Sequence, residues 1–455
     1  MMAADPVASR LLDRTGVCGA RRATLSQREK DHWPAFDRQI GPEKRGGRYA
    51  DYRIRTGFAF DRPICYATGD RKWSSGESRF SQRFKRNLTV AKILVIGAGA
   101  VGRGFVGPLL SKADVTLDFV DKEKALVDKF SGRTEYVTAF TGPDGYELVP
   151  VTFGNATRQE GVCDIDRYDT VFICVGPRNY LSCAQLVRDA RAVFVLENDR
   201  DASDRLGAAV GSERVRFGIP DAIVSNTATA ALLRRDPLCL IAERGELILE
   251  AGAKNPDLGD AVVWADTAEL ERHWICKFFI HNTSHAIVAF LGTLSGHAFV
   301  HEAMSDARIR PVVERAMQVI TEAVIAERLA EEKLARAYMA RELERFGNPL
   351  LLDPISRVTR DPLRKLDRGD RLIRALNLVI CAGLNAYPIM LGVNAALVHL
   401  ETANGEARSL RSDQSRSHRK VLREVCGLSD ENLILEILSV SASELLQPAQ
   451  AHSRD

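Results

Sequence analysis

Runs of consecutive apolar residues alternate with helically spaced apolar positions between Ala91 and about Glu250. Short continuous apolar runs are typical of strands buried on both faces of a parallel sheet, and the helical segments between them supply the crossovers. The alternation therefore predicts an α/β fold with a Rossmann-type, doubly wound parallel sheet. Its strands are expected at residues 91–96, 115–120, 170–175, 192–196 and 246–249.

From about Leu270 onward the pattern becomes almost wholly helical. Residues 402–420 are polar and rich in Ser and Arg, which predicts a mobile loop there. The chain is thus expected to comprise a Rossmann-type NAD-binding domain at residues 89–265 and a mostly α-helical substrate and catalytic domain at residues 266–455. Long segments with helical spacing cover residues 310–346, 370–400 and 421–446.

Residues 1–88 differ in composition from the rest of the chain. The first 90 residues hold 19 Lys and Arg against 10 Asp and Glu, whereas the other 365 hold 44 against 50. Little periodicity and several Gly and Pro breaks predict a basic, disordered N-terminal extension. Two alternatives stay open, namely a true start near Leu88 and a basic arm that touches nucleic acid.

Apolar runs and cysteines limit the class of protein. No apolar run approaches the ~20 residues that a membrane-spanning helix needs, and no N-terminal apolar segment indicates a signal peptide. The nine cysteines are scattered, without a C-x-x-C pair or zinc-ligand spacing. This pattern predicts a cytoplasmic protein in a reducing compartment, without a membrane partner or a bound metal.

A glycine-rich turn follows the first predicted strand and precedes a helical pattern. In the G-x-G-x-x-G arrangement the first glycine permits a tight turn, the second lets the backbone approach a pyrophosphate, and the third lets helix and strand pack closely. The following helix directs free N–H groups at the phosphates. The residues expected to bind a dinucleotide here are Gly97, Gly99, Ala100, Val101 and Gly102.

Polar residues and turns follow the ends of two further predicted strands. Asp121 ends the second strand, where a carboxylate accepts hydrogen bonds from the adenosine ribose and repels a 2′-phosphate, so NAD is the expected cofactor. The alternative is that Asp121 caps the helix beginning near Glu123. The turn Val175-Gly176-Pro177 is expected to contact the cofactor as well.

A helical stretch near residue 280 carries four polar side chains on one side. At about 100° per residue, Lys277, His281 and His285 fall at about 0°, 40° and 80°, and Asn282 at about 140°. Most neighbouring residues are apolar. A lysine in such surroundings is expected to have a depressed pKa, which suits a base near neutral pH. The alternative is a solvated polar face at a domain junction.

This stretch fits Lys-x4-Asn-x2-His, a pattern of the polyol-specific long-chain dehydrogenases, also called the mannitol dehydrogenase family. Residues 97–105, GAGAVGRGF, resemble the opening GAGxxGRGF of that family, and residues 286–297 resemble its post-catalytic helix. The resemblance covers roughly residues 91–446. Segments most similar to the mannitol-1-phosphate 5-dehydrogenase branch are residues 348–349, 357–366 and 370–373.

The resemblance implies roles for four residues and an architecture. Lys277 would be the general base, Asn282 and Asn198 would donate to the alkoxide that develops on the substrate oxygen, and His285 would orient the reacting hydroxyls. Lysine and amides would replace a catalytic metal. The active site would lie in the cleft between a Rossmann-type domain and a helical domain.

A phosphorylated substrate would need cationic partners, and four basic residues lie within nine positions: Arg360, Arg364, Lys365 and Arg368. The alternative is that they pair with nearby acids, namely Asp353, Asp361, Asp367 and Asp370. Two features depart from the branch. His281 stands where the branch has an apolar residue, and residues 225–229 replace an Asp-Arg-containing segment.

Together these patterns predict a metal-independent NAD-dependent oxidoreductase. It would interconvert a sugar-alcohol phosphate and a ketose phosphate, of the mannitol 1-phosphate and fructose 6-phosphate type. Two alternatives stay open: a dehydrogenase of a free polyol or a hexuronate-derived polyol acid, and a non-catalytic NAD-binding sensor. The expected partner is a small-molecule sugar alcohol or its phosphate.

Overall fold

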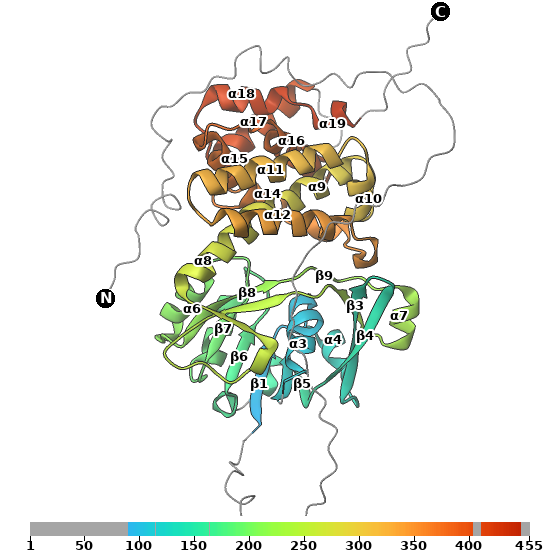
Figure 1. Ribbon diagram of the computed structural model, residues 1–455, viewed down its shortest axis with the longest axis vertical. Coiled ribbons are helices and arrows are strands. Elements are labelled where there is room, and N and C mark those ends of the chain that lie inside the picture. Colours follow the sequence, from blue (N-terminus) through green and yellow to red (C-terminus); the bar gives the residue numbers. More distant parts are fainter. Residues whose placement is uncertain (1–89, 114, 163, 404–410, 447–455) are drawn as a thin grey trace, which may run out of the picture. The chain divides into compact units, whose positions relative to one another are not determined.

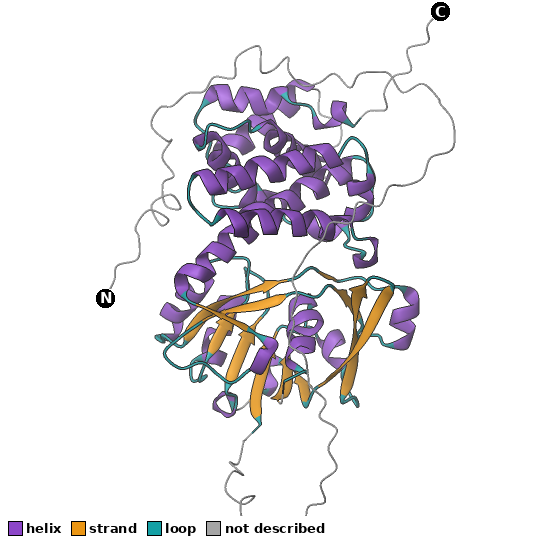
Figure 2. Cartoon of the chain, viewed as in Figure 1, coloured by secondary structure: helices purple, strands orange, loops and turns teal. Residues whose placement is uncertain are grey.

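The computed structural model of the chain describes residues 90–113, 115–162, 164–403 and 411–446. The extension predicted at residues 1–88 lies outside this part of the chain. Among the described residues, all named strands precede residue 266, and helices follow from there to the C-terminal side (Figure 1, Figure 2).

Six parallel strands form most of an eight-stranded sheet. Their spatial order, β5-β2-β1-β6-β7-β8, is the 3-2-1-4-5-6 order of Rossmann domains, so the predicted fold class is confirmed. The central strand is apolar and buried from Ile93 to Ile96, as a strand covered on both faces requires. The six strands are β1 (Ala91–Ile96), β2 (Val115–Val120), β5 (Asn155–Thr157), β6 (Thr170–Ile173), β7 (Val193–Val195) and β8 (Val215–Asp221).

The last strand of the expected parallel set runs the other way. β11 (Glu246–Glu250) pairs antiparallel with β8, and β12 (Val263–Ala265) extends the sheet parallel to β11. The chain re-enters the sheet at Gly245, at the end where β8 stops. An added Cβ there would lie 2.2 Å from the Asp221 carbonyl oxygen. The return at the same end forces the antiparallel direction.

The apolar pattern did not predict β8, because polar and small residues interrupt it. Arg216 lies over the Phe194 ring, with its guanidinium carbon 4.6 Å from the ring centroid. An added Cβ at Gly218 would lie 2.5 Å from Leu196, so a larger residue has no room there. A second sheet was also missed, in the order β4-β3-β10-β9. Its strands are β3 (Glu135–Gly142), β4 (Gly145–Thr152), β9 (Val224–Ser225) and β10 (Leu240–Ala242).

Short helices connect the strands, and longer ones follow them. None of the described helices is long and apolar enough to cross a membrane. The helices among the strands are α3 (Gly107–Leu110), α4 (Lys124–Asp128), α5 (Ala184–Val187), α6 (Ala202–Val210) and α7 (Ala230–Arg235). Those that follow are α8 (Thr267–Cys276), α9 (Thr283–Leu294), α10 (Val300–Ser305), α11 (Arg310–Ala326), α12 (Glu332–Gly347), α13 (Ile355–Val358), α14 (Pro362–Lys365), α15 (Arg371–Cys381), α16 (Tyr387–Ala403), α17 (Arg411–Glu424), α18 (Glu431–Ser439) and α19 (Ala442–Leu445).

Helix α9 is the centre of the helical part. Its residues from Thr283 to Gly292 are all buried, and it contacts α10, α11, α13, α15 and α16. A helix that is apolar on every face must be enclosed by others. Its closest neighbour is α16, where Gly392 faces Ile287, and an added Cβ would lie 2.5 Å from that side chain.

The loop expected at residues 402–420 is in large part helical. Helix α17 begins at Arg411, and only residues 404–410 of that segment lie outside the described part. His418 Nε2 lies 2.8 Å from Glu401 Oε1, which ties α17 to α16. Leu422, on the same helix, is fully buried. The polar composition reflects a helix with few buried positions, so the apolar pattern alone does not reveal it.

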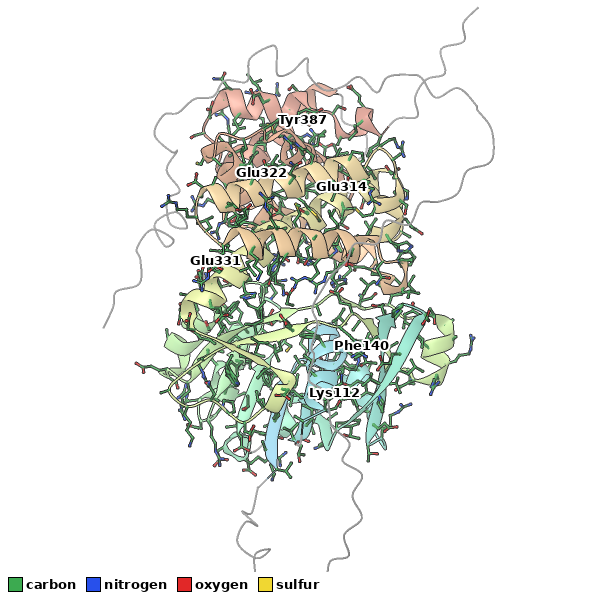
Figure 3. All side chains as sticks on the ribbon, viewed as in Figure 1. Lys112, Phe140, Glu314, Glu322, Glu331 and Tyr387 are labelled. Atoms are coloured by element: carbon green, nitrogen blue, oxygen red, sulfur yellow. The ribbon has the colours of Figure 1, made fainter. Side chains whose placement is uncertain are left out.

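Helix α11 shows how an exposed face is built. Arg310 Nε donates to Glu314 at 2.7 Å, and Gln318 donates to Glu322 at 2.9 Å, both at i,i+4 spacing. Figure 3 labels the two acceptors, Glu314 and Glu322. Such pairs stabilise a helix by a few tenths of a kcal/mol each. The opposite face, including Val313 and Ile320, is buried in the helical core.

We predict that Gly392→Ala destabilises the protein by about 1–3 kcal/mol, because an overpacked core must shift its neighbours. Gly347→Ala is the matched control, since an added Cβ there meets nothing within 4 Å and Gly347 ends helix α12 without a positive φ. Urea unfolding followed by circular dichroism measures both. Equal midpoints for the two variants would contradict the packing described here.

Candidate active site

The glycine turn after β1 has the geometry expected of a dinucleotide site. Gly97 has φ +99°, and an added Cβ would lie 2.4 Å from the Cys174 carbonyl oxygen, so only glycine fits this turn. An added Cβ at Gly102 would lie 2.0 Å from the Gly97 carbonyl oxygen. Gly99, in contrast, has no atom within 4 Å of that position, which leaves its backbone open to a ligand.

A helix begins directly at this turn. Ala100 and Val101 are its first helical residues, a π-helical segment η1 (Gly102–Val106) follows, and α3 continues it. The N-terminal N–H groups of such a helix attract anionic groups. The arrangement of glycines and helix therefore fits the pyrophosphate of a dinucleotide.

Two charged side chains, the half-buried Asp121 and the buried Arg103, bind the N–H and the carbonyl group of Ala98 inside this turn. Asp121 Oδ2 accepts from the Ala98 N–H at 2.8 Å, and Arg103 Nη1 donates to the Ala98 carbonyl at 2.9 Å. Arg103 is buried, and its Nε has no partner among the described residues. The sequence pattern did not assign Arg103 a role, although its position in the GRGF segment was noted.

Asp121 lies beside the glycine turn and does not cap α4. Its Oδ1 accepts from the Glu123 N–H at 2.9 Å, and Glu123 is the residue that caps the helix, by accepting from the Ala125 N–H. The carboxylate thus stands at the carboxyl end of β2, next to the peptide of Ala98.

The ends of β6 and β7 are linked by a buried carboxyl group. The N–H of Gly176, which has φ +93°, donates to Glu197 Oε1 at 2.7 Å. Burial raises the pKa of Glu197 to about 8, although these backbone donors oppose the shift. The neighbouring Asn198 is exposed. Glu197 therefore supports both the Val175 to Pro177 turn and the position of Asn198, a role not assigned from sequence.

Lys277 lies in a continuous helix formed by α8, a π-helical segment η6 (Lys277–Asn282) and α9. Its amine donates to the carbonyl oxygen of Pro220, near the end of β8. Burial lowers the pKa of Lys277 to about 8, which outweighs the opposing effect of Asp221. The solvated polar face considered as an alternative is wrong, since Lys277, Asn282 and His285 are all buried.

The π-helical segment changes the grouping expected from α-helical spacing. Hydrogen bonds in a π-helix run from residue i to i+5, so Asn282 follows Lys277 by one turn. The Asn282 Nδ2 is buried and has no hydrogen-bond partner among the described residues. A buried amide donor without a partner is costly, and a ligand oxygen would satisfy it.

His285 is held by residues that the sequence did not connect with it. Its Nε2 lies 2.8 Å from Asp353 Oδ2, and its ring stacks on Phe346 with centroids 4.9 Å apart. Burial lowers the pKa of His285 to about 4, so the ring is neutral at pH 7. Asp353 also accepts from Arg357, at 2.6 Å. A neutral imidazole that donates from Nε2 leaves Nδ1 as an acceptor.

The four basic residues expected to hold a phosphate do not act as one group. Arg364 pairs with Asp370 at 2.7 Å, whereas Arg360 and Arg368 are exposed. Lys365 is buried and donates to the Arg360 carbonyl. Burial, Arg371 and Arg364 lower the pKa of Lys365 to about 7.

The suggested pairing of these bases with nearby acids holds only in part. Asp361 lies 3.4 Å from Arg178 and Asp353 binds His285 and Arg357, so neither forms an ion pair with one of the four bases. No group of three or more potential metal ligands occurs among the described residues.

Residues 269–449 match the family model of the mannitol dehydrogenase C-terminal domain. The structure is similar to mannitol 2-dehydrogenase of Pseudomonas fluorescens in ternary complex with NAD and D-mannitol, with a TM-score of 0.63 and 17% identity over 79% of this chain and 92% of that one. It is also similar to D-sorbitol dehydrogenase in substrate-free form, with a TM-score of 0.58 and 14% identity over 76% and 91% of the two chains. At these identities the likenesses establish a shared fold.

We predict that Asp353→Asn lowers the free energy of unfolding at pH 7 by about 2 kcal/mol. Burial opposes ionisation, but Arg357 and His285 lower the pKa of Asp353 to about 2, below its value of about 3.9 in an unfolded chain. The stabilisation is therefore present above pH 4 and is lost as the pH falls through about 2. Denaturant unfolding at pH 7 and pH 3 measures it.

Asp361→Asn is the matched control, because Asp361 also faces an arginine but is half exposed. Its effect is expected to stay within about 0.5 kcal/mol. The free energies of unfolding of Asp353→Asn and of the original protein are compared at both pH values. A difference that stays constant from pH 7 to pH 3 would contradict the link between the pKa of Asp353 and stability.

Proposed function

On the premise that residues 269–449 form a mannitol dehydrogenase C-terminal domain, we propose that the protein is an NAD-dependent dehydrogenase that interconverts a polyol and its ketose. One observation carries the proposal: a buried amine with a pKa of about 8, Lys277, shares a continuous helix with the unpartnered amide of Asn282 and the neutral imidazole of His285. A base and two polar groups on one rigid element suit proton transfer from an alcohol.

The glycine turn supports NAD as the cofactor. The open backbone at Gly99 and the helix that begins at Ala100 suit a pyrophosphate. The turn after β6, and Asn198 after β7, would border the nicotinamide end of the cofactor. The carboxylate of Asp121 stands beside the turn, where a ribose would bind and a 2′-phosphate would be repelled. When bound, NAD accepts the hydride that leaves the carbinol carbon.

The residues of the Lys277 helix carry out the proton transfer and orient the substrate. Neutral Lys277 accepts the hydroxyl proton of the alcohol as the C–H bond breaks, and the ketone forms. The Asn282 amide donates to the developing negative charge on that oxygen, and the exposed Asn198 is proposed as a second donor. His285, fixed by Asp353, orients the substrate hydroxyls through Nδ1. In the reverse direction the protonated Lys277 returns the proton.

For the substrate we propose a sugar-alcohol phosphate of the mannitol 1-phosphate type. The support is an excess of positive charge in which Lys365 and Arg371 are buried and Arg364 is half-buried, and Asp370 is the acid that pairs with both arginines. A phosphate dianion would balance this charge and restore the ordinary pKa of Lys365.

A free polyol is the second candidate. Asp370 already neutralises Arg364, and among the described residues no acid forms an ion pair that would hold the exposed side chains of Arg360 and Arg368 in place for a phosphate. The fold likeness to a mannitol 2-dehydrogenase and a sorbitol dehydrogenase is compatible with either substrate.

We predict that Lys277→Met lowers turnover by at least about 100-fold and leaves NADH affinity unchanged. Polyol oxidation by the original protein should rise with pH around a midpoint near 8, because the neutral amine is the active form. Steady-state kinetics and NADH fluorescence titration measure these quantities. The exposed Lys333→Met is the control. If the protein binds NADH and its function does not change in Lys277→Met, it would instead be a sensor.

We predict at least a tenfold preference in kcat/KM for fructose 6-phosphate over fructose in NADH oxidation by the full chain, about 1.4 kcal/mol. Lys365→Met should remove most of this preference, because it removes the buried cation. A preference for fructose would move the protein to the free-polyol candidate. A preference for fructose 6-phosphate that is unchanged in Lys365→Met would contradict the role of Lys365 and place the phosphate elsewhere.

A further inference from the structure

A buried ionic network lies next to Lys277. Its members come from the end of β8, from the segment between β10 and β11, from η6 and from α12. All except Arg341 are at least nine-tenths buried. We refer to them together as the α12 network, and they are Asp221, Glu243, His281, Arg341, Glu342 and Arg345.

Arg345 is the centre of the α12 network. Its Nη1 lies 3.2 Å from Asp221 Oδ1 and 2.8 Å from Glu342 Oε1, and its Nε lies 2.9 Å from Glu243 Oε1. Arg341 binds the other oxygen of Asp221, at 2.7 Å. Two arginines thus face three carboxyl groups, of which burial raises the pKa of Glu243 to about 7.

The network reaches Lys277 from two sides. Lys277 donates to the carbonyl of Pro220, the residue directly before Asp221. Also on η6, four residues after Lys277, His281 Nδ1 binds the second oxygen of Glu342. The His281 ring lies 5.1 Å from that of His285, centroid to centroid. Lys277 is therefore enclosed by charges of both signs in a medium of low polarity, where charge interactions are strong.

We propose that the α12 network is a positioning device that sets the pH at which Lys277 exchanges its proton. The catalytic role of this exchange rests on the proposed function. Its carboxylates stabilise the ammonium form, and its arginines stabilise the neutral amine. His281, one of the positions at which this chain departs from the branch it resembles, binds Glu342.

The directions of the electrostatic effects agree with this geometry. After burial, which lowers the pKa of Lys277, Asp221 and Glu342 raise it and Arg345 and Arg341 lower it. A single network therefore contains side chains whose removal should shift the pKa of Lys277 in opposite directions.

The other titratable and charged groups near η6 lie outside the α12 network. On α9, burial lowers the pKa of His285 to about 4, and on α8, burial lowers the pKa of His273. On α15, Arg371 pairs with Asp370, and Arg374 lies over the rings of Phe278 and Phe279. The buried face of α11 carries no ionisable side chain.

The test compares Glu342→Gln with Arg341→Gln in the full chain. The readout is the NMR titration of 13Cε-labelled lysine without substrate, with the Lys277 signal assigned by its loss in Lys277→Arg. We expect the Lys277 midpoint to fall by about one pH unit in Glu342→Gln and to rise by a smaller amount in the partly solvated Arg341→Gln. Arg336→Gln, an exposed arginine of the same helix, should leave it unchanged.

Shifts in the same direction, or no shift in either folded variant, would overturn the proposal. If circular dichroism shows that Glu342→Gln does not fold, the rise in Arg341→Gln decides alone. The pH profile of polyol oxidation should move with the NMR midpoints. Opposite NMR shifts in a protein without polyol oxidation would leave the electrostatic inference standing and refute the proposed function instead.

Discussion

The burial of Lys277 is the constraint on which the rest of the site depends. An amine removed from water needs a hydrogen-bond acceptor and a balanced electrostatic environment. The Pro220 carbonyl supplies the acceptor, and the α12 network supplies the balance. Because Pro220 and Asp221 end a strand while Glu342 and Arg345 belong to a helix, the same contacts connect the Rossmann sheet to the helical part.

Two π-helical segments occur where the chain meets its proposed ligands. One, η1, follows the glycine turn, and the other, η6, begins at Lys277. Wide helical turns are less stable than α-helical ones and occur often at functional sites, because they re-aim side chains. In η6 the wide turn places Asn282 one turn after Lys277, and the enclosed helix α9 holds this geometry.

The supporting residues explain how short motifs become a site. In the glycine turn, Asp121 binds the N–H of Ala98 and Arg103 binds its carbonyl oxygen. Asp353 fixes the ring of His285. Each support is a buried or half-buried charged group with a specific acceptor or donor. The hydrogen bonds of such groups fix the orientation of their partners, which apolar packing does not do. Their burial costs free energy because it removes charge from water.

The sequence by itself determined the strands around the glycine turn, the change from sheet to helices, and the residues of the Lys277 helix, because periodicity and glycine spacing are local properties. It did not reveal β8, the second sheet or α17, whose polar residues interrupt the pattern. Only the tertiary structure decided that β11 is antiparallel, that Asp353 serves His285, and that the acids and arginines of α12 meet Lys277. The β8–β11 pairing joins residues 25 to 31 positions apart, and the pairs His285–Asp353 and Asp221–Arg345 join residues 68 and 124 positions apart. No local pattern encodes which buried charge binds which partner.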